Sequence, residues 1–175
     1  MSRSSLFSRL SARFDTDLLD PPVYRTPSPD PVMANLRAWC RLGLAPGGPP
    51  VAVARFAVRH CKPDEARVLD SLALDLDGSH RLAACPGGLA KLALRLRVKW
   101  ADALAGRALP ADHPWDAGHL IDGPDLLDRV GRFVPRRATL ILATDVAPAR
   151  MPAVVDLLTR RAAGFDQPVR LLVVG

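Results

Sequence analysis

The sequence predicts an α/β fold, a three-layer sandwich built on a mostly parallel sheet of about four strands. Short apolar segments of strand length alternate with longer segments that repeat apolar residues at helical spacing. The segments 138–144 (ATLILAT) and 169–174 (VRLLVV) are almost continuously apolar, which is typical of strands covered on both faces. Strands that alternate with helices are joined by crossovers, and this favours parallel pairing.

Four segments have the length and composition of strands, and five have the periodicity of helices. The expected strands are 51–58, 118–121, 138–144 and 169–174. The expected helices are 31–42, 64–77, 89–104, 124–130 and 152–163. Residues 80–88 are expected to form a loop, because they include Pro86, Gly87 and Gly88.

The expected helix 89–104 has two distinct faces. Its apolar positions recur at helical spacing and define one face: Leu89, Leu92, Ala93, Leu96, Trp100 and Leu104. The other face carries Lys91, Arg95 and Lys99, flanked by Arg97. We expect this basic face to be solvated, although it could also contact the phosphates of a nucleic acid.

The length of 175 residues suggests one domain with a short arm. Residues 20–31 contain five prolines, which fix φ and remove hydrogen-bond donors. Residues 1–31 are therefore predicted to be a flexible N-terminal arm with a Pro-rich connector. Residues 32–175 are predicted to be the α/β domain.

The charge balance is basic, with 24 Lys and Arg against 18 Asp and Glu, a net +6. Only three of these cations are lysines, and such an Arg-, Ala- and Pro-rich composition is typical of a GC-rich genome. The surplus is therefore a weak indicator of nucleic-acid binding. No apolar run is long enough for a membrane span, and no signal-peptide pattern is present, so we expect a cytoplasmic protein.

Several classes of site are not supported by the motifs. Three cysteines exclude a disulfide scaffold, and neither a C-x₂-C nor an H-x₃-H spacing of a structural zinc site occurs. No G-x-S-x-G nucleophile motif occurs. We expect no metal ion. His119 lies in a short strand, where a packed histidine is more common than a catalytic base.

Five segments occur in an order that resembles a nucleotide-binding core. They are LRAWC at 36–40, CPGGLAKLALRL at 85–96, WDAGHL at 115–120, ATLILATD at 138–145 and PVRLLVVG at 168–175. This order is similar to that of the P-loop NTPase domain of bacterial STAND-type signalling ATPases, over roughly residues 32–175. The resemblance implies a P-loop-like α/β fold and a site for ATP or GTP with Mg²⁺.

The phosphate-binding motif implied by this resemblance is incomplete. A P-loop needs glycines around the phosphates, a lysine for the β- and γ-phosphates, and a Ser or Thr for Mg²⁺. Gly87, Gly88 and Lys91 match, but Leu92 stands where the magnesium hydroxyl should be. In an alternative register, segment 51–58 is the first strand and residues 59–66 (RHCKPDEA) form the phosphate loop. That loop has no glycine, and its two acidic residues would repel phosphate.

Asp145 follows an apolar strand and matches the Walker B aspartate of the resemblance. Open α/β sheets bind ligands at the carboxyl ends of their strands, so its position suits a ligand site. It is also an ordinary strand terminator, and no glutamate follows it to activate water.

These observations favour a non-catalytic P-loop-like domain that acts in protein interaction or regulation in a bacterial cytoplasm. We expect a protein partner and no hydrolysis of ATP. Two alternatives remain open: a weak ATP- or GTP-binding module using Gly87, Gly88, Lys91 and Asp145, and a nucleic-acid-associated protein using Lys91, Arg95, Arg97 and Lys99.

Overall fold

The computed structural model describes residues 17–23, 31–44, 48–56, 63–103 and 113–175. Its strands are β1 Leu19–Asp20, β2 Val51–Phe56, β3 Asp116–Leu120, β4 Thr139–Ala143 and β5 Val169–Val174. Its α-helices are α1 Pro31–Arg41, α2 Pro63–Leu76, α3 Ser79–Ala84, α4 Gly87–Ala103, α5 Leu126–Arg132 and α6 Met151–Arg161. The short 3₁₀ helices η1 Leu42–Leu44 and η2 Ala162–Gly164 follow α1 and α6.

The strands form one five-stranded sheet in the order β1-β3-β4-β5-β2. The pairs β3–β4, β4–β5 and β5–β2 are parallel, and only the two-residue β1 is antiparallel to its neighbour β3. The four expected strands are therefore confirmed in one mostly parallel sheet. The fifth strand, β1, was not expected, because two residues are too few to show a periodicity.

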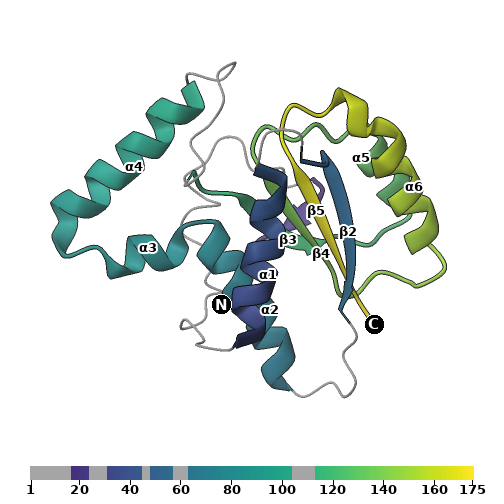
Figure 1. Ribbon diagram of the computed structural model, residues 1–175, viewed down its shortest axis with the longest axis horizontal. Coiled ribbons are helices and arrows are strands. Elements are labelled where there is room, and N and C mark those ends of the chain that lie inside the picture. The colour runs from purple at the N-terminus through teal and green to yellow at the C-terminus, as the bar shows by residue number, and fades with distance from the viewer. Residues whose placement is uncertain (1–16, 24–30, 45–47, 57–62, 104–112) are drawn as a thin grey trace.

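Helices cover both faces of the sheet (Figure 1). On one face, α5 and α6 pack against alternate residues of β4 and β5, including Ile141 and Leu171. On the other face, α1 and α2 pack against Leu140 and Leu172. All five residues of β4 are buried, which agrees with its position between two parallel neighbours and two helical layers.

Helices α3 and α4 extend away from the sheet, on the left of Figure 1. We call α3 and α4 together the helical arm. Residues 80–88 had been expected to form a loop, and this prediction is wrong in part because α3 occupies residues 79–84. The chain turns at Gly78, whose φ of 82° is readily adopted by glycine. A new helix, α3, therefore begins at Ser79, directly after this turn.

The segment predicted as the N-terminal arm contributes to the core. Leu18 and Leu19 are each 1% exposed and pack in the cluster that α5 and α6 cover. Ile121 donates its backbone N–H to the carbonyl of Leu18, next to the pairing of β1 with β3. Within the described residues, the core therefore begins at residue 18.

An Arg and a Cys are buried between α1 and the sheet. Arg170 of β5 is 1% exposed and donates from Nη1 to the carbonyl oxygens of Pro49 and Val169. Cys40 of α1 is fully buried, and this burial raises its pKa to about 12, although Arg170 acts in the opposite direction. Cys40 is therefore a packing residue and not a nucleophile.

Gly118 tests the contact between β1 and the sheet. A Cβ atom at this position would collide with the backbone carbonyl oxygen of Asp20. We expect Gly118→Ala to lower the free energy of unfolding by about 1–3 kcal/mol, measured by urea denaturation, because β1 has to shift. Gly164→Ala is the matched control, since no atom lies within 4 Å of the added Cβ. Equal stability of the two variants would contradict the pairing of β1 with β3.

Candidate functional site

The residues predicted to bind nucleotide lie on different parts of the fold. Gly87 and Gly88 begin α4, and Lys91 lies in its first turns. The preceding segment is the helix α3, not the strand that a P-loop would follow. Asp145 lies after β4 at the carboxyl edge of the sheet. No hydrogen bond or ion pair joins Lys91 to Asp145 within the described residues.

A chain of polar side chains crosses the carboxyl edge of the sheet at Asp145. Thr144 donates its hydroxyl to Asp145 Oδ2 at 3.0 Å, and the same hydroxyl oxygen lies 3.0 Å from His119 Nδ1. The other ring nitrogen, Nε2, lies 2.8 Å from Asp70 Oδ1 on α2. The chain thus links α2 to the ends of β3 and β4.

A carboxylate stands at each end of this polar chain. Asp70 is buried and acts as the acceptor for His119 Nε2–H. Thr144 Oγ1 lies within hydrogen-bond distance of both Asp145 Oδ2 and His119 Nδ1, so one hydroxyl joins the carboxylate to the imidazole. Two carboxylates at this edge favour a cation over a phosphate. His119 was expected to be a packed histidine, and the structure adds hydrogen bonds at both of its nitrogens.

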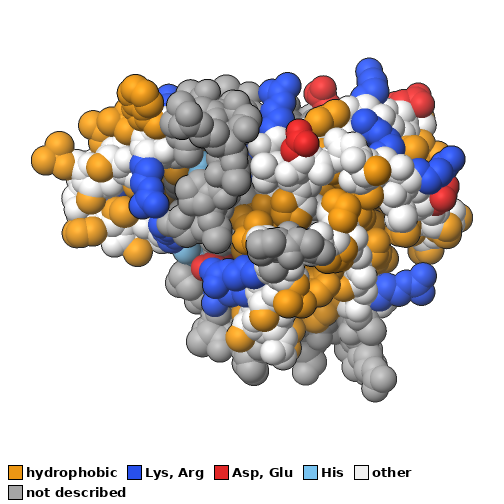
Figure 2. Space-filling view, turned by 45° about the horizontal axis from the view of Figure 1, so that its top comes forward, with side chains coloured by type: hydrophobic (Ala, Val, Ile, Leu, Met, Phe, Trp, Pro, Cys, Tyr) orange, Lys and Arg blue, Asp and Glu red, His pale blue; other side chains and the backbone are white. Residues whose placement is uncertain are grey.

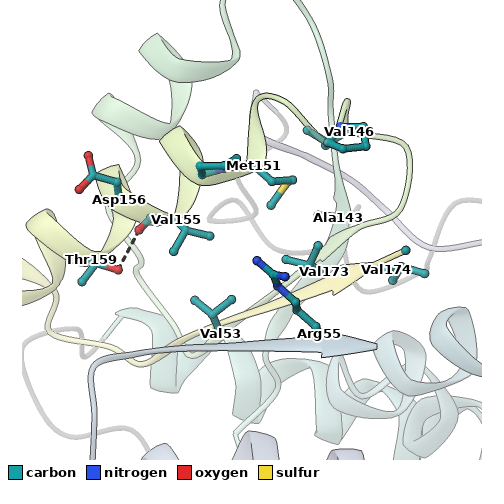
Figure 3. A pocket seen from close by; sticks show the side chains of 13 residues that line it. Val53, Arg55, Ala143, Val146, Met151, Val155, Asp156, Thr159, Val173 and Val174 are labelled. Carbon is teal, nitrogen blue, oxygen red and sulfur yellow. Dashed lines mark hydrogen bonds between the residues drawn. The ribbon is translucent and has the colours of Figure 1, made fainter. Parts of the chain in front are cut away.

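An apolar groove of about 790 Å³ runs between α6 and the strands β2 and β5 (Figure 3). Its apolar walls are Val53 and Val173 on the strands and Met151 and Val155 on α6. Arg55 extends from β2 into the groove, as Figure 3 shows.

The rim of the groove includes two polar side chains of α6, Asp156 and Thr159. Asp156 lies on α6 at one edge, but it pairs with Arg160 at 2.6 Å. Thr159 donates its hydroxyl to the carbonyl of Val155 within the same helix. The polar groups of α6 thus have partners of their own, and no described feature selects one ligand class for the groove.

The loops that follow β3 and β4 are tied together. Arg150 donates from Nη1 to Asp122 Oδ1 and to the carbonyl oxygen of Gly123, both at 2.7 Å. The pKa of Asp122 lies below its usual range. Desolvation raises this pKa, but hydrogen bonds from the backbone N–H groups of Gly123 and Ala147, together with the positive charge of Arg150, lower it by more. This part of the carboxyl edge is occupied by structural contacts.

The helical arm joins the body through a polar cluster at Asp75 of α2. Arg37 of α1 pairs with Asp75 through Nε and Oδ2 at 2.8 Å, and His80 of α3 lies 3.9 Å away, measured from Nδ1 to Oδ1. Asp77 accepts the backbone N–H of Ser79 at the start of α3. Interaction with the His80 ring holds the pKa of Asp75 below its usual range; partial burial opposes this and Arg37 supports it.

Helix α4 exposes the apolar face that its sequence pattern defines. Leu89 is 84% exposed, Leu92 51%, Leu96 47% and Trp100 68%. Instead, Val98 and Leu94 pack against Leu82 of α3. Figure 2 shows hydrophobic side chains projecting from the end of the molecule that α4 forms. The apolar face is exposed because α4 packs beside α3 rather than on the sheet.

We call Leu89, Leu92, Leu96 and Trp100 the α4 stripe. Large exposed apolar residues are common singly, but four that line one helix at intervals of three and four residues form a continuous surface. The cations around it are not all solvated as expected: Lys91 and Arg95 are half-buried, whereas Arg97 and Lys99 are exposed.

The comparisons with known proteins give no relative. No family model, curated protein or solved structure matches this chain. Within the described residues, no group of three His, Cys, Asp or Glu side chains is placed to hold a metal ion, and no helix has the length and apolar character to cross a membrane. Among the described residues, the α4 stripe is the candidate functional surface.

The cluster at the base of the arm predicts a dependence on pH. Folding lowers the pKa of Asp75 below its ordinary value of 3.8, so its stabilising effect is complete above that value and is lost as the pH falls toward the folded pKa. We expect Asp75→Asn to cost about 1–2 kcal/mol of unfolding free energy near neutral pH, and progressively less below about pH 4.

Urea denaturation of the wild type and the variant at several pH values measures this difference. Asp156→Asn removes an exposed carboxylate from α6 and serves as the control, with a small effect at every pH. A cost of Asp75→Asn that stays constant between neutral and acid pH would contradict the role assigned to the carboxylate.

Proposed function

We propose that this chain is a non-catalytic, P-loop-like α/β domain that acts in protein interaction or regulation in a bacterial cytoplasm, and that the α4 stripe is its binding surface. The observation that carries the proposal is the exposure of Leu89, Leu92, Leu96 and Trp100 on a helix that extends from the body. Exposed apolar patches on soluble domains are typical of contact sites for other macromolecules.

The spacing of the stripe supports a protein partner. Anchors at i, i+3, i+7 and i+11 follow one side of a helix, and this is the pattern with which a helix binds in a groove of another protein. The P-loop-like part of the proposal is supported by two placements. Strand β2 leads toward α2, and the fully buried β4 ends just before Asp145, where the resemblance places a Walker B aspartate.

Two alternatives are less well supported. A weak nucleotide-binding module would need Lys91 and Asp145 to meet one phosphate chain, and they lie on different elements with no strand before Gly87. A nucleic-acid contact through α4 would place the apolar stripe against phosphates, because Arg97 and Lys99 lie on opposite sides of it. Neither geometry uses the exposed leucines.

The first test concerns catalysis. Phosphoryl transfer depends on positioning and on charge neutralisation by Mg²⁺ and Lys, and Leu92 offers no hydroxyl for the metal. We expect no phosphate release from ATP or GTP above the buffer background in a coupled assay with Mg²⁺. A steady turnover that disappears in both Lys91→Ala and Asp145→Ala would contradict the proposal. A turnover that survives both substitutions would indicate a contaminant.

The second test concerns the α4 stripe. The double variant Leu92→Ser/Leu96→Ser should keep its stability within about 1 kcal/mol, because the substituted side chains are half exposed. It should retain about tenfold less of any specific partner from a native extract, since apolar anchors dominate such contacts. Quantitative mass spectrometry of proteins captured by the immobilised chain measures this loss.

A matched control removes exposed apolar side chains elsewhere. Leu42 is 67% exposed and Val134 is 56% exposed, and both lie outside the helical arm. Leu42→Ser/Val134→Ser should capture the same proteins as the wild type. Identical capture by the stripe variant and the wild type would show that the α4 stripe is not the binding surface.

A further inference from the structure

The helical arm carries a surplus of cations. Residues 79–103 contain five Lys and Arg and one acidic residue, Asp102, whereas the whole chain has 24 Lys and Arg and 18 Asp and Glu. Lys91, Arg95 and Lys99 form no ion pair within the part of the chain that the structure describes. These three side chains therefore present positive charge that no described acidic residue pairs with.

The cations border the α4 stripe on both sides. Arg95 and Lys99 follow Leu92 and Leu96 by three residues each, so they lie along one border of the stripe. Arg97 lies three residues before Trp100 on the opposite border, because successive residues turn by about 100° around the helix. An apolar strip with cations on both margins results.

The dimensions of this surface suit a protein groove. From Leu89 to Trp100 the stripe extends about 17 Å at 1.5 Å per residue, and it is about one side chain wide. A second copy of this chain is a poor occupant, because an α4–α4 pair would place Arg97 and Lys99 against the same cations. A nucleic acid that bound the cations through its phosphate backbone would leave the leucines of the α4 stripe exposed to water.

We propose that α4 binds an apolar groove or helix whose margins carry Asp and Glu. This inference rests on the proposed function and names the chemistry of the partner: leucine-sized pockets for the stripe, and carboxylates placed to pair with Arg95 and Lys99. Charge complementarity of this kind sets partner choice and the rate of association, whereas the apolar anchors supply most of the affinity.

Two synthetic three-heptad peptides test the inference with the full chain. Both carry Leu at the a and d positions; one carries Glu and the other Lys at the e and g positions. Binding is followed by the anisotropy of a labelled peptide and by the emission of Trp100, with Trp100→Phe as the spectral control. We expect the Glu peptide to bind about tenfold tighter or more, with an affinity that falls as salt is added.

Charge reversal on α4 sharpens the test. Lys99→Glu should weaken the Glu peptide by about threefold or more and strengthen the Lys peptide. Arg136→Glu makes the same change in net charge at an exposed position outside the arm and should alter neither affinity. Equal affinity for the two peptides, or tighter binding of the Lys peptide, would overturn the acidic partner while leaving the stripe as a binding surface.

Two further outcomes separate the possible failures. Vesicles of phosphatidylcholine with phosphatidylglycerol are the membrane probe; a shift of Trp100 emission with these vesicles and none with the Glu peptide would assign the arm to an anionic bilayer instead. If neither peptide nor vesicle binds, and Leu92→Ser/Leu96→Ser captures the same proteins as the wild type, the proposed function itself fails.

Discussion

The arrangement of this protein depends on the need to cover a parallel sheet on both faces. Strands β4 and β5 have parallel neighbours on both sides and apolar side chains above and below, so helices must pack on each face. α1 and α2 occupy one face, and α5 and α6 the other. The helices α3 and α4 then have no apolar sheet surface to cover, and they extend from the body (Figure 1).

This constraint explains why an amphipathic helix exposes its apolar side. Helix α4 is held to α3 by a small cluster of Leu82, Leu94 and Val98, which leaves the α4 stripe to solvent. The direction of the arm is set by the turn at Gly78 and by the pairing of Asp75 with its neighbours on α1 and α3. A polar anchor at the base and an apolar surface at the end are typical of a projecting contact element.

The sequence predicted the sheet well because its signals are local. β4 and β5 are almost continuously apolar, and the helices that pack on them have strong 3.6-residue periodicity. β1 could not be predicted from two residues, and α3 was hidden because Gly78 and Pro86 bracket a segment shorter than two helical turns. Periodicity also predicts that a helix has an apolar face, but not whether any surface remains for it to cover.

The candidate surfaces were harder to predict because they depend on contacts between distant segments. The polar chain from Asp70 to Thr144 joins residues 49 and 25 positions apart, and its histidine had no motif around it. Arg170 lies within an apolar strand, yet it is buried with its guanidinium on backbone carbonyls. Gly87, Gly88 and Lys91 were predicted to bind nucleotide because they match part of the P-loop motif. That motif does not show that they lie at the start of a helix that projects from the body.

The solvent exposure of Trp100 tests the central claim most directly. The difference between the emission spectra of the wild type and Trp100→Phe isolates this indole from Trp39, which is half-buried, and Trp115, which is buried. We predict a component with the emission maximum of tryptophan in water and efficient quenching by acrylamide and by iodide, which the neighbouring cations attract. A blue-shifted component that resists both quenchers would show that the α4 stripe is covered by the chain itself and would contradict this account.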